Sequence, residues 1–140
     1  MIQQLTVFLE NKEGRLSDAT QTIANAGINM HALNIAESSD FGVLRIICDK
    51  PEVAAEALTN AGFRANCTPV LAIQVSGDVG GLAELLEKLD ELGINIEYGY
   101  CYSSDGDKAV DILKVKSQAV EVELRAAGVS VLEPADVYVC

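Results

Sequence analysis

The chain has 140 residues, 49% of them hydrophobic, and it carries a formal net charge of −11 at pH 7. These values predict a folded protein with a real core, in one domain or two small ones. The acidity argues against nucleic acid as a partner, because phosphate backbones are also negative. No apolar run is long enough to span a bilayer, and the first residues lack the basic region and cleavage site of a secretory signal, so we expect a cytoplasmic protein without a membrane partner.

Metal, disulfide and catalytic chemistry find little support in the sequence. The cysteines Cys48, Cys67, Cys101 and Cys140 include no Cys-x-x-Cys pair, and His31 is the only imidazole. Free thiols are therefore expected, and neither a metal site nor a cofactor is predicted. A Gly-x-Ser-x-Gly nucleophile elbow, a phosphate-binding glycine loop and a helical histidine pair are also missing, so we do not expect an enzyme.

The first half of the chain alternates between patterns typical of strands and of helices. The β-prone run QQLTVFL precedes GRLSDATQTIANAG, in which apolar residues recur at helical spacing before Gly27 ends the helix. INMHALNIAES and FGVLRIICD predict strands around the turn SSDFG, and Pro51 opens a second helix that Gly62 ends. FRANCT predicts a short last strand, which Pro69 ends.

The second half repeats this order. VLAIQVS predicts a strand, and a leucine-rich helix follows it. INIEYGYCYS and AVDILKV predict strands around the turn SDGDK, and a helix over 117–127 and a strand near VSVL complete the pattern. Tyr98, Tyr100 and Tyr102 alternate along one predicted strand and therefore share one face, which core or interface packing explains more simply than an aromatic wall for a ligand.

The two halves are copies of one another. A shift of 66 residues without gaps places Gly27-Ile-Asn on Gly93-Ile-Asn, and it places Ile46 on Ile112. We therefore predict two domains, over 1–68 and 69–140. Each has the order β-α-β-β-α-β, which is the ferredoxin-like α+β pattern with an antiparallel four-stranded sheet and both helices on one face. The short linker leads us to expect that the two domains pair.

The end of the chain matches the same repeat. The shift carries VLAI at 70–73 onto DVYV at 136–139. These last residues therefore resemble a third first strand. We expect this segment to pair with an open sheet edge, because a free β-prone run would invite aggregation.

Two polar elements recur in both copies. The turns ENKEGRL and SGDVGGL contain glycine, which lets a ligand approach the main chain, and each opens a helix whose first N–H groups suit a carboxylate. Asn29 and Asn95 stand at the start of the next strand, where an asparagine can satisfy loop backbone groups or present a donor and an acceptor to a ligand. Turn and strand start meet at one edge of the predicted fold, and both explanations stay open.

The repeated features resemble tandem ACT domains, small amino-acid-sensing modules attached to many enzymes of amino-acid metabolism. The resemblance covers nearly the whole chain and rests on Gly-x-Leu in each turn, on the Gly-Ile-Asn that follows and on the element order. It implies modules that pair side by side, in a homodimer, with an amino acid between the turn of one module and the second strand of its neighbour. The residues that it implicates are Asn11, Gly14, Arg15, Leu16, Asn29 and Met30, with His31 nearby, in the first copy, and Asp78, Gly80, Gly81, Leu82, Asn95 and Ile96 in the second.

Two hypotheses follow for the function. The first is a stand-alone regulatory module that binds a free amino acid between its domains. The second is a ligand-free subunit that docks on a metabolic enzyme through its sheet edges. Glu13 and Val79 stand where the family often has proline. The resemblance therefore does not fix the loop conformation or the choice of ligand.

Overall fold

The computed structural model describes residues 1–37, 40–103 and 107–138, and they divide into two compact units. The N-terminal unit consists of Gln3–Thr68 together with Val137 and Tyr138. The C-terminal unit consists of Pro69–Asp136 together with Met1 and Ile2. Each end of the described chain therefore belongs to the unit that the other half of the sequence builds. The turn residues 38–39 and 104–106 and the last two residues of the predicted tail lie outside the described residues.

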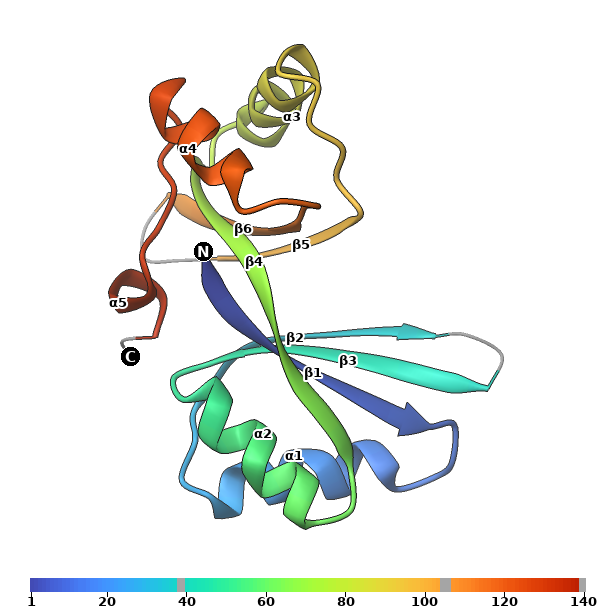
Figure 1. Cartoon of the computed structure of the whole chain (residues 1–140). Helices are drawn as coiled ribbons and strands as arrows, with labels where there is room; N and C mark the ends of the chain where they lie inside the picture. The colour runs from blue at the N-terminus through green and yellow to red at the C-terminus, as the bar shows by residue number, and fades with distance from the viewer. Residues whose placement is uncertain (38–39, 104–106, 139–140) are drawn as a thin grey trace. The chain divides into compact units, whose positions relative to one another are not determined.

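The N-terminal unit has the predicted order of elements (Figure 1). Its sheet has the strand order β2-β3-β1-β4, with antiparallel pairing of β1 with β3 and of β2 with β3. Alternate residues of β1, among them Leu5 and Val7, face the helices and are fully buried with Leu44 and Ile46 of β3. The elements are β1 (Ile2–Glu10), α1 (Arg15–Asn25), β2 (Met30–Glu37), β3 (Phe41–Cys48), α2 (Pro51–Asn60) and the first part of β4 (Arg64–Ser76).

The C-terminal unit follows the same plan with a reduced fourth strand. Its core joins one face of the sheet β4-β6-β5 to both helices, through Leu71, Leu85 and Leu124. The strand predicted near VSVL is limited to one bridge between Ile73 and Val131, so that expectation is only partly right. The elements are α3 (Gly81–Glu91), β5 (Tyr98–Ser103), β6 (Lys108–Lys114), α4 (Ala119–Ala126) and α5 (Pro134–Val137).

Strand β4 corrects the expectation that Pro69 ends a strand. A single strand of 13 residues runs from Arg64 to Ser76 through the proline. Before Pro69, β4 lies beside β1, where the Thr6 and Thr68 hydroxyl groups form a hydrogen bond of 2.8 Å. The pairing with β6 starts at Leu71. The residues that pair with β6 begin two positions after the proline, so the missing N–H of Pro69 breaks none of those pairs.

The ungapped alignment of the two copies is out of register by one residue at β6. Leu5 pairs with Ile46 in the first copy, whereas the equivalent Leu71 pairs with Leu113, and not with Ile112. Ile46 and Leu113 both belong to the cores that face the helices, whereas Ile112 points to the other face of the sheet. A shift of one residue exchanges the two faces of a strand, so burial decides the register here.

Strand β5 also differs from its predicted bounds. It begins at Tyr98, four residues after the predicted start at Ile94. Ile94 and Ile96 nevertheless pack against the core of the C-terminal unit. Tyr98, Tyr100 and Tyr102 are half-buried and alternate with exposed residues, which confirms that the three share one face of the sheet.

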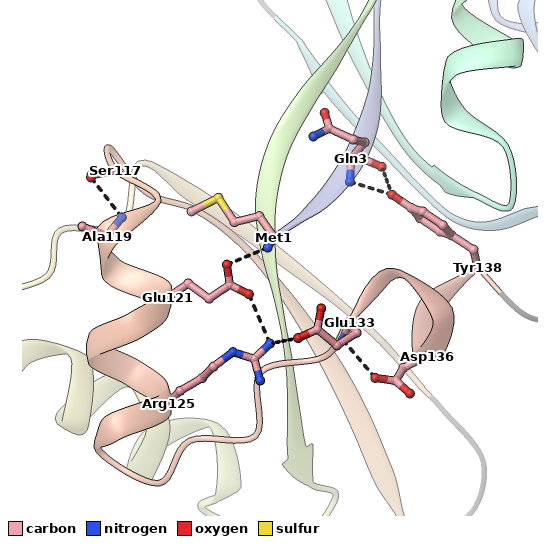
Figure 2. A network of polar contacts seen from close by, with 9 residues as sticks. All are labelled: Met1, Gln3, Ser117, Ala119, Glu121, Arg125, Glu133, Asp136 and Tyr138. Carbon is pink, nitrogen blue, oxygen red and sulfur yellow. Dashed lines mark hydrogen bonds and ion pairs between the residues drawn. The ribbon is translucent and has the colours of Figure 1, made fainter.

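The tail is not a third strand over its described part. Residues Pro134–Val137 form the short helix α5, because proline is accommodated at a helix start and Asp136 caps the turn by accepting a hydrogen bond of 2.9 Å from the N–H of Glu133. Tyr138 then contacts β1 through its side chain. Its hydroxyl accepts a hydrogen bond from the Gln3 N–H at 2.6 Å and donates one to the Gln3 carbonyl at 3.0 Å, as Figure 2 shows.

A chain of ion pairs links helix α4 to the segments around it in the C-terminal unit (Figure 2). Glu121 accepts a hydrogen bond of 2.7 Å from the ammonium group of Met1 and one of 3.2 Å from Arg125, which also pairs with Glu133. The bond from the ammonium group, and then the bond from Arg125, lower the pKa of Glu121, because both favour the charged carboxylate.

Candidate functional site

The turn between β1 and α1 places Arg15 at the start of a helix. Gly14 has a φ of 84°, a conformation that favours glycine, and it precedes α1 without a side chain that caps the first N–H groups. Those donors and the guanidinium group of Arg15 lie in the same turn. A helix start of this kind favours negative charge.

A hollow of about 260 Å³ lies beside this turn, and we call it the turn hollow. Asn11, Arg15 and Leu16, all implicated by the resemblance, are among its lining residues, and β2 contributes Ile35 and Glu37. The hollow therefore combines cations, carboxylates and apolar side chains. Its lining is Leu9, Glu10, Asn11, Lys12, Arg15, Leu16, Ile35, Glu37 and Gly42.

A second hollow, of about 240 Å³, shares Arg15 and Glu10 with the turn hollow, and we call it the aromatic hollow. The guanidinium carbon of Arg15 lies 4.3 Å from the centre of the Phe63 ring, and that of Arg64 lies 5.7 Å from the centre of the Phe8 ring. These are cation–π distances. Its lining is Phe8, Glu10, Arg15, Phe41, Gly62, Phe63 and Arg64.

Of the residues that line the aromatic hollow, the sequence-based prediction included only Arg15 and missed Phe8, Glu10, Phe41, Gly62, Phe63 and Arg64. They come from the end of β1, the start of β3 and the turn after α2, which lie far apart in the sequence. The one local signal is Phe63-Arg64, an aromatic residue and a cation directly after the glycine that ends a helix.

Glu10 carries the negative charge at the rim shared by the two hollows. Its carboxylate forms an exposed ion pair of 2.8 Å with Lys12. The hydrogen bond from Lys12, the charge of Lys12 and then the charge of Arg15 lower the pKa of Glu10, because each stabilises the carboxylate. Such an exposed pair is weak, so Lys12 and Glu10 can both turn to a ligand.

Asn29, Met30 and His31 line neither hollow. The Asn29 N–H donates a hydrogen bond of 3.1 Å to the Asp49 carboxylate, and the Asp49 N–H donates one of 3.2 Å to the Asn29 carbonyl. The Met30 side chain packs against the core. The Nε2 atom of His31 is buried without a hydrogen-bond partner. The structure thus brings Asn11, Arg15 and Leu16 together but not the three residues of the next strand.

The turn of the second copy differs in chemistry. Asp78 closes the turn on itself, because its carboxylate accepts a hydrogen bond of 2.9 Å from the Ser76 hydroxyl, and that hydroxyl accepts one of 3.1 Å from the Asp78 N–H. Gly80 has a φ of 91°, like its counterpart in the first copy. A Cβ atom at Gly81 would collide with the Ser76 carbonyl oxygen, so the main chain is tightly folded here.

A hollow of about 330 Å³ lies beside this second turn. Gly81 lines it with Glu84, Lys88 and residues of the segment after α4. The other predicted residues of the second site lie outside this lining: Leu82 is exposed on α3, Asn95 is exposed, and Ile96 packs against the core. The second site therefore keeps the shape of the turn without an arginine.

Two buried groups lie outside both turns. Asp111 on β6 is only 3% exposed, its Oδ2 atom has no hydrogen-bond partner, and burial raises its pKa. Burial also raises the pKa of the Cys48 thiol to about 11, so this cysteine stays protonated and unreactive at neutral pH. The described residues contain no group of three or more potential metal ligands and no helix long and apolar enough to cross a membrane.

The sequence and fold match known proteins. Residues 1–134 match the model of a family described as the ACT domain pair. A crystallised protein of Bacteroides thetaiotaomicron is 37% identical; the match covers 99% of this chain and 96% of that one, with a TM-score of 0.91. The ligand-free regulatory subunit of aspartate kinase from Thermus thermophilus is 18% identical over 90% of both chains, with a TM-score of 0.64.

A third solved structure, E. coli aspartokinase III in complex with lysine and aspartate, is 15% identical, with a TM-score of 0.51. That match covers 89% of this chain and 31% of the kinase. At these low identities, the two kinase-related structures are similar to this chain in fold alone. A search of curated proteins finds no match.

Proposed function

The chain belongs to the ACT domain pair family, and we propose that it is a non-catalytic regulatory module whose effector is a free amino acid. The observation that carries this proposal is the turn hollow. It offers the guanidinium group of Arg15 and uncapped N–H groups at the start of α1, which suit the carboxylate of an amino acid.

The same hollow can meet the other parts of an amino acid. The carboxylates of Glu10 and Glu37 are acceptors for its ammonium group, and Leu16 and Ile35 offer apolar contacts for its side chain. A volume of about 260 Å³ lies just below the usual range for ligand sites and suits a small molecule. We further propose that a neighbouring module supplies the remaining contacts, as in the family that the sequence resembles.

A second candidate function is docking on another protein. Leu33 is 45% exposed and Ile35 is 44% exposed, and both lie on β2, which is an edge strand of the sheet. An apolar edge strand can pair with a further strand. This edge fits a homodimer or a metabolic enzyme, and the regulatory subunit of aspartate kinase, which is similar in fold, is a subunit of such an enzyme.

The two functions are separated by a thermal melting screen against the twenty amino acids. We expect one or a few of them to raise the melting temperature, since a ligand at 100 times its dissociation constant stabilises a fold by about 2.7 kcal/mol. Arg15→Gln should abolish that shift. Lys116→Gln removes one exposed positive charge from the C-terminal unit and is the matched control.

The outcome that contradicts the effector proposal is equally clear. If none of the twenty amino acids moves the midpoint at millimolar concentration, the chain has no amino-acid effector and the docking function replaces it. If Arg15→Gln and Lys116→Gln reduce the shift equally, the turn hollow is not the site.

A further inference from the structure

The aromatic hollow has a composition that the turn hollow lacks. Two arginines and three phenylalanines surround about 240 Å³ in an acidic protein. Phe8 is 37% exposed and Phe41 is 53% exposed, so two of the three rings keep much of their surface open. All of the lining residues belong to the N-terminal unit.

The two arginines are prepared to bind an anion. Among the described residues, neither Arg15 nor Arg64 forms an ion pair, and the Nε atom of Arg15 is buried without a hydrogen-bond partner. Each guanidinium group lies over a phenylalanine ring, which occupies the face of the group but leaves the donors at its edge free. Such edge donors bind carboxylates in a two-point geometry.

The phenylalanines favour an anion that also carries an aromatic group. Phe8 and Phe41 stand beside the arginines with open surface, and aromatic rings prefer offset or edge-to-face contact with another ring. A small inorganic anion would leave this apolar wall in water. An anion with an aromatic group would cover it.

We propose that the aromatic hollow binds a small carboxylate that carries an aromatic ring, with the carboxylate on Arg64 and Arg15 and the ring against Phe8 and Phe41. This inference rests on the proposed function where the ligand is an aromatic amino acid, whose ammonium group would meet Glu10. An aromatic acid without an ammonium group has the same two recognition elements, and the experiment separates the two sources.

The experiment titrates the intact chain by calorimetry with L-phenylalanine, phenylacetate, L-alanine and acetate. We expect one or both of the aromatic carboxylates to bind and the two compounds without a ring to bind at least ten-fold more weakly. Arg64→Gln should weaken the aromatic ligand about ten-fold or more, because a hydrogen bond to a charged group is lost. Phe8→Leu should weaken it by up to about ten-fold, because ring contacts are lost.

Lys116→Gln is the matched control for charge, and the melting temperature of each variant is measured without ligand to show that it is folded. Arg64 and Phe8 are not buried, so we expect both variants to fold. Equal weakening by Arg64→Gln and Lys116→Gln would overturn the inference, because it would mean that the ligand responds only to overall charge.

The titrations with different compounds and variants also distinguish failure of the aromatic site from failure of the amino-acid effector proposal. Binding of phenylacetate but of no amino acid supports the aromatic hollow and contradicts the amino-acid effector. Binding of a non-aromatic amino acid that depends on Arg15 but not on Arg64 supports the effector proposal and overturns this inference. Failure of both aromatic compounds to bind at millimolar concentration overturns it as well.

Discussion

The two copies of the repeat have the same turn geometry and different chemistry. Gly14 and Gly80 both have positive φ angles and both precede a helix. After that glycine the first copy has Arg15, next to two hollows, whereas the second has Gly81, packed against Ser76. Duplication has therefore kept what the backbone requires, and only the first copy places an arginine directly after this glycine.

The cores differ as sharply as the turns. Leu44 pairs with Val7 and is fully buried, and at the equivalent place in the C-terminal unit Asp111 pairs with Ile73 and is 3% exposed. A buried carboxylate without a partner destabilises the folded state when it is charged. Asp111 is buried because of its position in the sheet and despite its polarity. The C-terminal unit therefore tolerates a residue that lowers its stability.

The largest effect should come from giving the first copy the residue of the second. Leu44→Asp removes a fully buried side chain and adds a carboxylate without a partner. We expect it to lower the free energy of unfolding by more than about 4 kcal/mol, beyond the range of ordinary substitutions. Urea denaturation measures this loss, and Leu44→Ala, at about 2–5 kcal/mol, isolates the part due to the cavity. Comparable losses for the two variants would show that the charge adds nothing.

The reverse exchange should stabilise the protein. Asp111→Leu replaces the buried carboxylate with the residue type found in the first copy, and we expect a gain of about 1–3 kcal/mol at pH 7. Asp111→Asn keeps the shape and removes only the charge. If neither variant melts above the parent at pH 7, Asp111 has a partner that stabilises its charged form.

The gain in stability from replacing Asp111 should depend on pH. Burial raises the pKa of Asp111, so the folded state binds its proton more tightly than the unfolded state, in which carboxyl groups ionise near about pH 3.9. The loss of stability that the buried Asp111 causes is absent below about pH 3.9. It grows as the pH rises to the raised pKa and is constant above that pKa. The gain from Asp111→Asn should therefore be larger at pH 7 than at pH 3.5, and an equal gain at both would contradict the assigned charge.

A smaller effect should distinguish the two turns. Gly81→Ala places a Cβ atom against the Ser76 carbonyl oxygen, and we expect a loss of about 1–3 kcal/mol from overpacking. The equivalent residue Arg15 already carries a side chain, so Arg15→Ala tests the same position without a collision. Thermal melting of both variants measures the difference. A larger loss for Arg15→Ala would mean that stacking on Phe63 stabilises the first turn more than close packing stabilises the second.

The smallest effect concerns the repeated asparagines. Asn29→Ala and Asn95→Ala should weaken the binding of an amino-acid effector by different amounts. Each loss is on the order of 1 kcal/mol if a hydrogen bond to the ligand is lost. The main chain of Asn29 is already bonded to Asp49, so the backbone role should survive the substitution. Calorimetric titration of both variants decides the matter, and unchanged affinity in both would assign Gly-Ile-Asn to the fold alone.

The order of strands and helices in the first copy and the duplication follow from the sequence alone. Apolar residues at helical or alternating spacing predicted the elements, and Gly27 and Gly93 predicted where two helices end, because a positive φ at a helix end strongly favours glycine. These are local properties of the chain. The cluster of Asn11, Arg15 and Leu16 was predictable for the same reason, since all three lie within one turn.

Only the tertiary structure decided the features that depend on residues far apart. Strand β4 continues through Pro69, ahead of the residues that pair with β6, and the register of β6 is set by burial of Leu113 on the face of the helices. Arg64 reaches Phe8 only because β1 and β4 lie side by side. Sequence spacing carries no information about such partners, because the contact energy that selects them arises only when the sheet is assembled.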